Sequence, residues 1–116
     1  MTVVADPDAI TQVLYNLLDN AVKFAAEGSC LCVSLWKEDG KAYVSIKNRG
    51  ETISEDDLPL IFDRFHKSDK SRSLDRDGVG LGLYLVKTIL DAHNEDIAVT
   101  SRDGITEFVF SLTLDK

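Results

Sequence analysis

The stretch DPDAITQVLYNLLDNAVKF, residues 6–24, decides how the rest of the chain is interpreted. Asp6 suits the N-cap of a helix, Pro7 its first position and Asp8 its first turn. Apolar residues then recur at the helical spacing i, i+3, i+4, i+7. They are Ile10, Val13, Leu14, Leu17, Leu18, Ala21 and Val22. The pattern predicts an α-helix from about Pro7 to Phe24 with one buried side.

The segments outside this helix predict two hairpins and two shorter helices. Residues 2–4 suit a short edge strand, and residues 30–48 and 97–114 each form two strand-like runs around an Asp-Gly turn. Residues 54–62 predict a short helix with Ser54 as N-cap, and about Gly80 to Asn94 predicts another. Together these elements predict an α/β two-layer sandwich, with a mixed, mostly antiparallel sheet and about three helices on one face.

Composition limits the class of protein. The 116 residues predict one domain, residues 1–116, and a hydrophobic content of 44% suffices for one core. A net charge of −7 argues against nucleic acid as a partner. No apolar run approaches the ~20 residues that span a membrane, and no signal peptide follows Met1. Cys30 and Cys32 are poorly spaced for a disulfide and have no neighbouring histidine to complete a zinc site, so we expect buried thiols in a reducing cytosol.

The first predicted helix carries an unusual polar stripe. At about 100° per residue, Asn16, Asn20 and Lys23 fall within about 60° of each other, beside Val13 and Phe24. Asparagine is unfavourable in mid-helix, whereas its amide oxygen is a hard ligand that suits Mg²⁺, and a lysine one turn on suits a phosphate. An exposed polar face explains the same stripe when the helix is considered alone.

Three glycines precede the last helix in RDGVGLGLYLVK, residues 76–87. Glycine in a helix costs about 1 kcal/mol relative to alanine, so Gly78, Gly80 and Gly82 indicate either a loose turn or a close backbone approach to an anion. The preceding polar residues 63–77 are typical of a lid or binding loop. No strand precedes the glycines and no G-K-[ST] follows them, which excludes a Rossmann or P-loop site.

Several motifs occur in the order that one superfamily shows. NLLDNAVKF resembles the N box of the GHKL ATPases, which include gyrases, Hsp-type chaperones, histidine kinases and MutL proteins. NRGETI, LPLIFDRFHKSDKSR, DGVGLGLYLVK and GITEF resemble the first glycine box, F box, second glycine box and last glycine-threonine segment of the histidine kinase branch. The resemblance covers Asp6 to Leu114. It implies the Bergerat ATP-binding fold, with ATP between the helices and a lid of roughly Phe65 to Val79.

The resemblance also implies roles for individual residues. Asn20 would be the main Mg²⁺ ligand, with Asn16 as a second metal ligand. Asn16 stands at the position where the gyrase branch has a catalytic glutamate, but an amide cannot act as a general base. Lys23 would contact phosphate, while Arg64 and Arg72 would offset charge on the γ-phosphoryl group. The catalytic set is thus Asn16, Lys23, Arg64 and Arg72. The implied nucleotide contacts are Asn16, Asn20, Lys23, Phe24, Asn48, Gly50, Thr52, Ile53, Phe62, Gly78, Val79, Gly80, Leu81, Gly82 and Thr106.

Two residues depart from the family pattern. Asn48 replaces an aspartate that accepts a hydrogen bond from adenine, so we expect weaker ATP binding than an aspartate would give. A second hypothesis is that the Asn48 amide tolerates guanine. Thr52 replaces a glycine, and we expect its side chain to narrow the approach of the backbone.

The implied function is the catalytic and ATP-binding domain of a two-component sensor histidine kinase, which transfers the γ-phosphoryl group of Mg·ATP to a histidine on a separate dimerisation domain. Neither His66 nor His93 stands in a phosphoacceptor setting, so we expect no autophosphorylation of this chain alone. The expected partners are ATP, the phosphoacceptor domain and a response regulator, with no nucleic acid or membrane contact. We expect a cytoplasmic monomer, cut from a membrane-anchored parent. An anti-sigma-factor-type serine kinase and a degenerate nucleotide-binding docking module stay open as alternatives.

Overall fold

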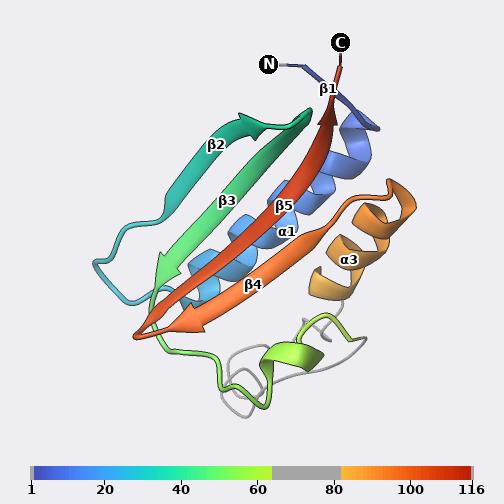
Figure 1. Ribbon diagram of the computed structural model, residues 1–116. Coiled ribbons are helices and arrows are strands. Elements are labelled where there is room, and N and C mark those ends of the chain that lie inside the picture. Colours follow the sequence, from blue (N-terminus) through green and yellow to red (C-terminus); the bar gives the residue numbers. More distant parts are fainter. Residues whose placement is uncertain (1, 64–81, 116) are drawn as a thin grey trace.

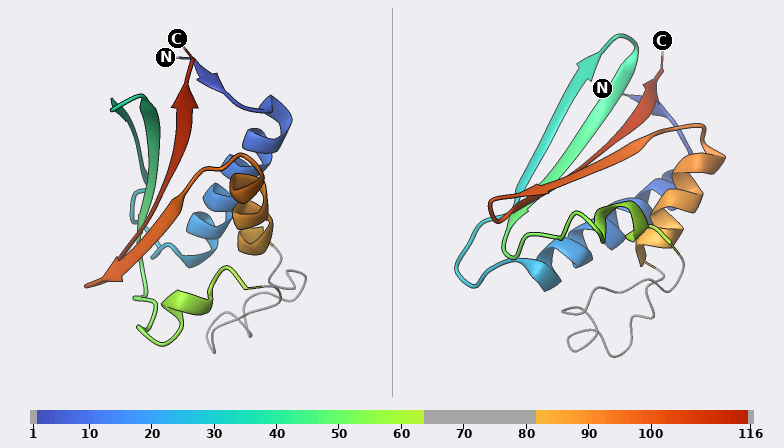
Figure 2. Two further views of the ribbon diagram at one scale, coloured as in Figure 1. Left: turned by 45° about the vertical axis from the view of Figure 1, so that its right-hand side comes forward. Right: turned by 60° about the horizontal axis from the view of Figure 1, so that its bottom comes forward.

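The computed structural model describes residues 2–63 and 82–115. Its elements are β1 (Val3–Val4), α1 (Pro7–Phe24), β2 (Cys32–Glu38), β3 (Lys41–Arg49), the 3-10 helix η1 (Leu58–Leu60), α3 (Gly82–Ala92), β4 (Ile97–Arg102) and β5 (Ile105–Leu114). A curled sheet forms one layer, and α1 and α3 lie side by side on one of its faces (Figures 1 and 2). The predicted α/β two-layer sandwich is confirmed.

The sheet is antiparallel throughout the part of the chain that the structure describes. β5 is central: it pairs with β3 on one side and with β4 and the short β1 on the other, while β2 forms an edge beyond β3. Both predicted Asp-Gly turns are confirmed. Asp39 and Gly40 have φ of 51° and 81°, and Asp103 and Gly104 have φ of 54° and 80°, the left-handed values that tight hairpins require.

The predicted bounds of the first helix are confirmed, and the Asp6 side chain accepts a hydrogen bond from the Asp8 backbone as an N-cap. Val13, Leu17 and Ala21 are buried against the sheet, where they share the core with Ile46 and Phe108. Leu18 and Val22 belong to the same apolar pattern but are 36% and 62% exposed. They lie on the side of α1 that faces away from α3, which helical geometry leaves uncovered.

Two sequence predictions are wrong. Cys30 and Cys32 are exposed rather than buried, because β2 is an edge strand whose seven residues are all exposed. Residues 54–62 do not form an α-helix. The Ser54 hydroxyl accepts a hydrogen bond from the Asp57 backbone at 3.2 Å as an N-cap would, but only the 3-10 helix Leu58–Leu60 follows, and Pro59 lacks the N–H that an α-helix would use.

One buried acid joins the two hairpins. The Glu95 carboxylate accepts hydrogen bonds from Lys41 (2.7 Å), Ser111 (2.9 Å) and Thr113 (2.8 Å). Burial raises the pKa of Glu95, but the hydrogen bonds from Lys41, Thr113 and Ser111 and the Lys41 charge outweigh it and lower the pKa. The ionised carboxylate therefore stabilises the fold.

His93 joins the end of α3 to the start of α1. Its Nδ1 lies 2.8 Å from the Ile89 carbonyl oxygen, to which it donates, and its Nε2 accepts from the Asp6 backbone at 3.2 Å. Both ring nitrogens are therefore engaged.

No helix within residues 2–63 or 82–115 combines the length and apolarity that crossing a membrane demands.

Candidate functional site

Gly50 lies where three segments of the chain cross, and this crossing builds one end of the site. Ala25, just after α1, forms an antiparallel bridge with Gly50, and Gly50 donates from its backbone to the Gly104 carbonyl at 2.7 Å. A Cβ on Gly50 would lie 2.1 Å from the Phe24 carbonyl oxygen. Only glycine permits this approach, so Gly50 brings the end of α1 onto the ends of β3 and the β4–β5 hairpin.

A row of polar residues crosses the helix-covered face of the sheet next to this crossing. Asn48 on β3 pairs with Thr106 on β5, which pairs with Ser101 on β4. Asn48 and Thr106 are each only 4% exposed. Directly opposite residues point to the same side of an antiparallel sheet. The pair Ile46 and Phe108 lies two residues further along the same two strands and belongs to the core, so the polar row lies on the core face as well.

Asn48 differs from the other two residues of the row because its carboxamide makes no hydrogen bond with any residue between 2 and 63 or between 82 and 115. Thr106 and Ser101 are joined by a hydroxyl–hydroxyl hydrogen bond of 2.7 Å. A buried amide that has no partner costs about 1–3 kcal/mol, so Asn48 is a group that a bound ligand would satisfy.

The segment after β3 closes over this row. Ile53 donates from its backbone to the Ser101 hydroxyl at 2.7 Å. Thr52 is exposed, and its hydroxyl accepts a hydrogen bond from the Gly104 backbone at 2.7 Å. Ile53 and Phe62 pack against the core, and Phe62 meets the Phe108 ring edge to face. These apolar side chains form a wall beside Asn48 and Thr106.

The polar stripe of α1, formed by Asn16, Asn20 and Lys23, faces α3. Asn16 donates to the Gly82 carbonyl at the first residue of α3 (3.4 Å) and accepts from Gln12 (3.0 Å). Asn20, one turn on, is partly exposed, and its side chain makes no hydrogen bond within the described residues. Lys23 pairs with Asp19 at 3.3 Å, and both side chains are about half exposed. Phe24 is partly buried at the end of the stripe.

A metal at this place would need help from its ligand. The described residues hold no cluster of three His, Cys, Asp or Glu side chains. A lone amide oxygen such as that of Asn20 nevertheless fits Mg²⁺, which keeps several waters and takes its remaining ligands from substrate phosphates. The donor set thus fits a metal that arrives with a phosphate ligand.

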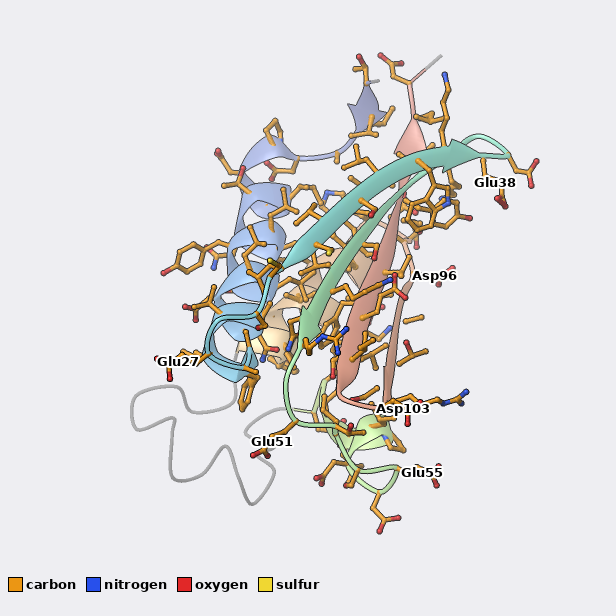
Figure 3. All side chains as sticks on the ribbon, turned by 90° about the vertical axis from the view of Figure 1, so that its left-hand side faces the viewer. Glu27, Glu38, Glu51, Glu55, Asp96 and Asp103 are labelled. Atoms are coloured by element: carbon orange, nitrogen blue, oxygen red, sulfur yellow. The ribbon has the colours of Figure 1, made fainter. Side chains whose placement is uncertain are left out.

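Acidic side chains lie near the site, together with Lys23, Arg49 and Arg102 of the flanking segments. Glu51, Glu55 and Asp103 lie toward the same end of the molecule, with Glu27 nearby and Glu38 at the opposite end (Figure 3). Like charges repel an anion at short range. A phosphate ligand here would therefore require a metal ion or local cations for charge compensation.

The structure brings the predicted residues together along the C-terminal half of α1; they are Asn16, Asn20, Lys23, Phe24, Asn48, Gly50, Thr52, Ile53, Phe62, Gly82 and Thr106. Arg64, His66, Arg72, Gly78, Val79, Gly80 and Leu81 lie outside the described residues. Sequence reasoning missed Ser101. The alternation of Ile97, Val99 and Ser101 along β4 is the signal that would have placed it on the core face.

A two-layer sandwich that buries a carboxamide with no side-chain partner among residues 2–63 and 82–115, beside a helix that carries two asparagines, is typical of a small-molecule site. The profile described as histidine kinase-, DNA gyrase B-, and HSP90-like ATPase matches residues 5–116. The chain belongs to this ATPase family, which implies ATP binding.

The comparisons also place the chain near sensor kinases. It is 38% identical over 110 residues to the sensor histidine kinase CusS of Escherichia coli (strain K12), covering 95% of this chain and 23% of CusS. It is 40% identical over 101 residues to the sensor histidine kinase WalK of Bacillus subtilis (strain 168), covering 85% of this chain and 16% of WalK. The chain therefore spans less than a quarter of these relatives.

Solved structures agree. The mycobacterial sensor histidine kinase MprB matches with a TM-score of 0.83 and 28% identity, over 96% of this chain and 74% of that one. A nucleotide-free catalytic domain of the histidine kinase ThkA matches with a TM-score of 0.82 and 30% identity, over 96% and 70%. The expected resemblance to the histidine kinase branch, and with it an ATP-binding catalytic domain of the sensor kinase type, is confirmed.

Proposed function

We propose that the chain binds Mg·ATP between α1, α3 and the helix-covered face of the sheet, and presents the γ-phosphoryl group to a histidine on a separate dimerisation domain. One observation carries the proposal: Asn48 is buried, lies beside Thr106, and its carboxamide has no hydrogen-bond partner within the described residues. An adenine amino group would donate to the Asn48 oxygen, with Thr106 as a second contact. Ile53, Phe62 and Phe24 would enclose the ring.

The phosphates would lie along the polar stripe of α1. Asn20, with Asn16 beside it, would hold Mg²⁺, and Lys23 would contact a phosphate oxygen. When bound, Mg²⁺ would offset phosphate charge beside the acidic side chains of this end of the molecule (Figure 3). The first residues of α3, near Asn16, add the positive end of a helix dipole. By resemblance, Arg64 and Arg72 would contact the γ-phosphate, and Gly78, Val79, Gly80, Leu81 and Gly82 would approach the phosphates.

The acceptor histidine would come from outside this domain. His93 uses both ring nitrogens inside the fold, which supports a structural role. Asn16 is an amide and cannot act as a general base toward water, so slow ATP hydrolysis is expected and the nucleophile would be the imidazole of the partner. The proposed partners are the phosphoacceptor domain and, downstream, a response regulator. The proposed state of the chain is a monomer on the cytoplasmic side of the parent kinase.

A transfer assay tests this function. The chain is incubated with γ-³²P-ATP and Mg²⁺, alone and with a separately produced dimerisation domain of its own parent kinase. Acid-labile ³²P is expected on the added domain only. Asn20→Ala should abolish the transfer, whereas Tyr15→Ala should leave it unchanged, because Tyr15 is 65% exposed on another side of the same helix. Label on the chain itself would contradict the proposed roles of His66 and His93.

A further inference from the structure

Ser101 sits at the end of the polar row and touches two groups that the site uses. Its hydroxyl accepts a hydrogen bond from the Ile53 backbone and lies 2.7 Å from the Thr106 hydroxyl. Ser101 is itself partly buried. A hydroxyl has one proton to donate, so the direction of the Ser101–Thr106 hydrogen bond decides what Thr106 offers to a ligand.

The Ile53 contact favours one direction. If Ser101 donates to Thr106, the chain from the Ile53 N–H through Ser101 to Thr106 is polarised one way, and the Thr106 proton is free to be donated. If Thr106 donates instead, the Ser101 proton has no acceptor within the described residues. Hydrogen bonds in a one-way chain strengthen one another, and the remaining proton then lies on Thr106, opposite Asn48, where a bound ligand can accept it. The first direction therefore prevails.

We infer that Ser101 is a positioning residue that determines base selectivity, because it holds Thr106 as a donor beside the Asn48 carboxamide. This inference rests on the proposed nucleotide site. The edge of adenine carries an amino donor next to a ring-nitrogen acceptor, which matches the Asn48 oxygen and the Thr106 proton. Guanine carries a carbonyl oxygen next to a ring N–H. Asn48 can turn its amide group toward that oxygen, but the ring N–H offers no acceptor for the Thr106 proton, which then stays unpaired.

Ser101 would thus supply the discrimination that Asn48 alone lacks. An amide side chain both donates and accepts, so Asn48 alone suits adenine and guanine equally. The hypothesis that the site tolerates guanine therefore requires that the Thr106 hydroxyl can also turn. Removing the Ser101 hydroxyl would free it. We expect Ser101→Ala to lower the ratio of ATP to GTP affinity about tenfold, in line with the penalty for one unpaired buried group.

The test measures the dissociation constants of Mg·ATP and Mg·GTP by calorimetry for the 116-residue chain and three variants. Ser101→Ala should reduce the ATP-to-GTP ratio, and Ser101→Thr, which keeps the hydroxyl, should restore it. Thr100→Ala is the matched control, because Thr100 is the preceding residue of β4 and is exposed on the other face. Thermal unfolding of each variant reports whether the fold is intact.

The outcomes separate the two proposals. If the unmodified chain binds no ATP, the proposed function fails and this inference fails with it. If the chain binds ATP but Ser101→Ala weakens ATP and GTP by the same factor, Ser101 only holds Ile53 in place and the inference alone is overturned. An unchanged ratio in Ser101→Ala with unchanged affinities also overturns it.

Discussion

Gly50→Ala should unfold the crossing that builds the site. The new Cβ would lie 2.1 Å from the Phe24 carbonyl oxygen and 3.3 Å from the Ala26 nitrogen. Side-chain rotation cannot relieve this contact because both neighbours are backbone atoms. The segment that follows α1 must move away from Gly50. This movement weakens the hydrogen bonds from Ala26 to the Arg49 carbonyl and from Gly50 to the Gly104 carbonyl, each 2.7 Å. Loss of two backbone hydrogen bonds together with the strain costs about 2–3 kcal/mol.

Urea denaturation followed by far-ultraviolet circular dichroism measures this loss. Gly82→Ala is the matched control, because a Cβ there meets nothing within 4 Å, and we expect it to change the free energy of unfolding by less than about 1 kcal/mol. A Gly50→Ala free energy of unfolding within 0.5 kcal/mol of the unmodified chain, on the order of the uncertainty of extrapolation, would refute the steric argument.

Three further predictions test other parts of the account. The pKa of Glu95 is lowered in the folded chain, so its contribution to stability is complete above the unfolded-state pKa of about 4.3 and is lost as pH falls through the lower folded-state pKa. Urea titrations from about pH 6 down to about pH 3, which bracket the unfolded-state value, should show a flatter dependence of the unfolding free energy on pH for Glu95→Gln. His93→Phe removes the hydrogen bonds to Ile89 and Asp6 and should lower the free energy of unfolding by about 1–2 kcal/mol, and no shift in the urea midpoint would contradict the role of His93. Asn48→Asp should strengthen ATP binding about fivefold in calorimetry, since a charged acceptor makes the stronger hydrogen bond, and weaker binding would count against Asn48 as the base contact.

Local chemistry explains what the sequence predicted well. The bounds of α1 follow from Asp6, Pro7 and the apolar period, and the hairpin turns follow from Asp39-Gly40 and Asp103-Gly104. Each signal lies within a few residues of the feature it specifies. The same reasoning failed for Cys32, because burial of a strand depends on a neighbour that the sequence of the strand does not name.

The candidate site was predicted only in part for the same reason. The polar stripe lies on one helix and was visible as a spacing. The row of Asn48, Thr106 and Ser101 depends on the register of three strands. The resemblance to a family indicated Asn48 and Thr106 as nucleotide contacts, but not that they lie opposite each other in the sheet. Ser101 was missed because a serine on an alternating strand looks ordinary until its partners Ile53 and Thr106 are placed beside it.

The most direct test of the account is calorimetric titration of the chain with ATP, with and without Mg²⁺, alongside Asn20→Ala and Asn48→Ala. The account predicts binding that Mg²⁺ strengthens, that Asn20→Ala weakens mainly in the presence of Mg²⁺, and that Asn48→Ala weakens in both conditions. Absence of binding at millimolar ATP by a chain shown to be folded would contradict it.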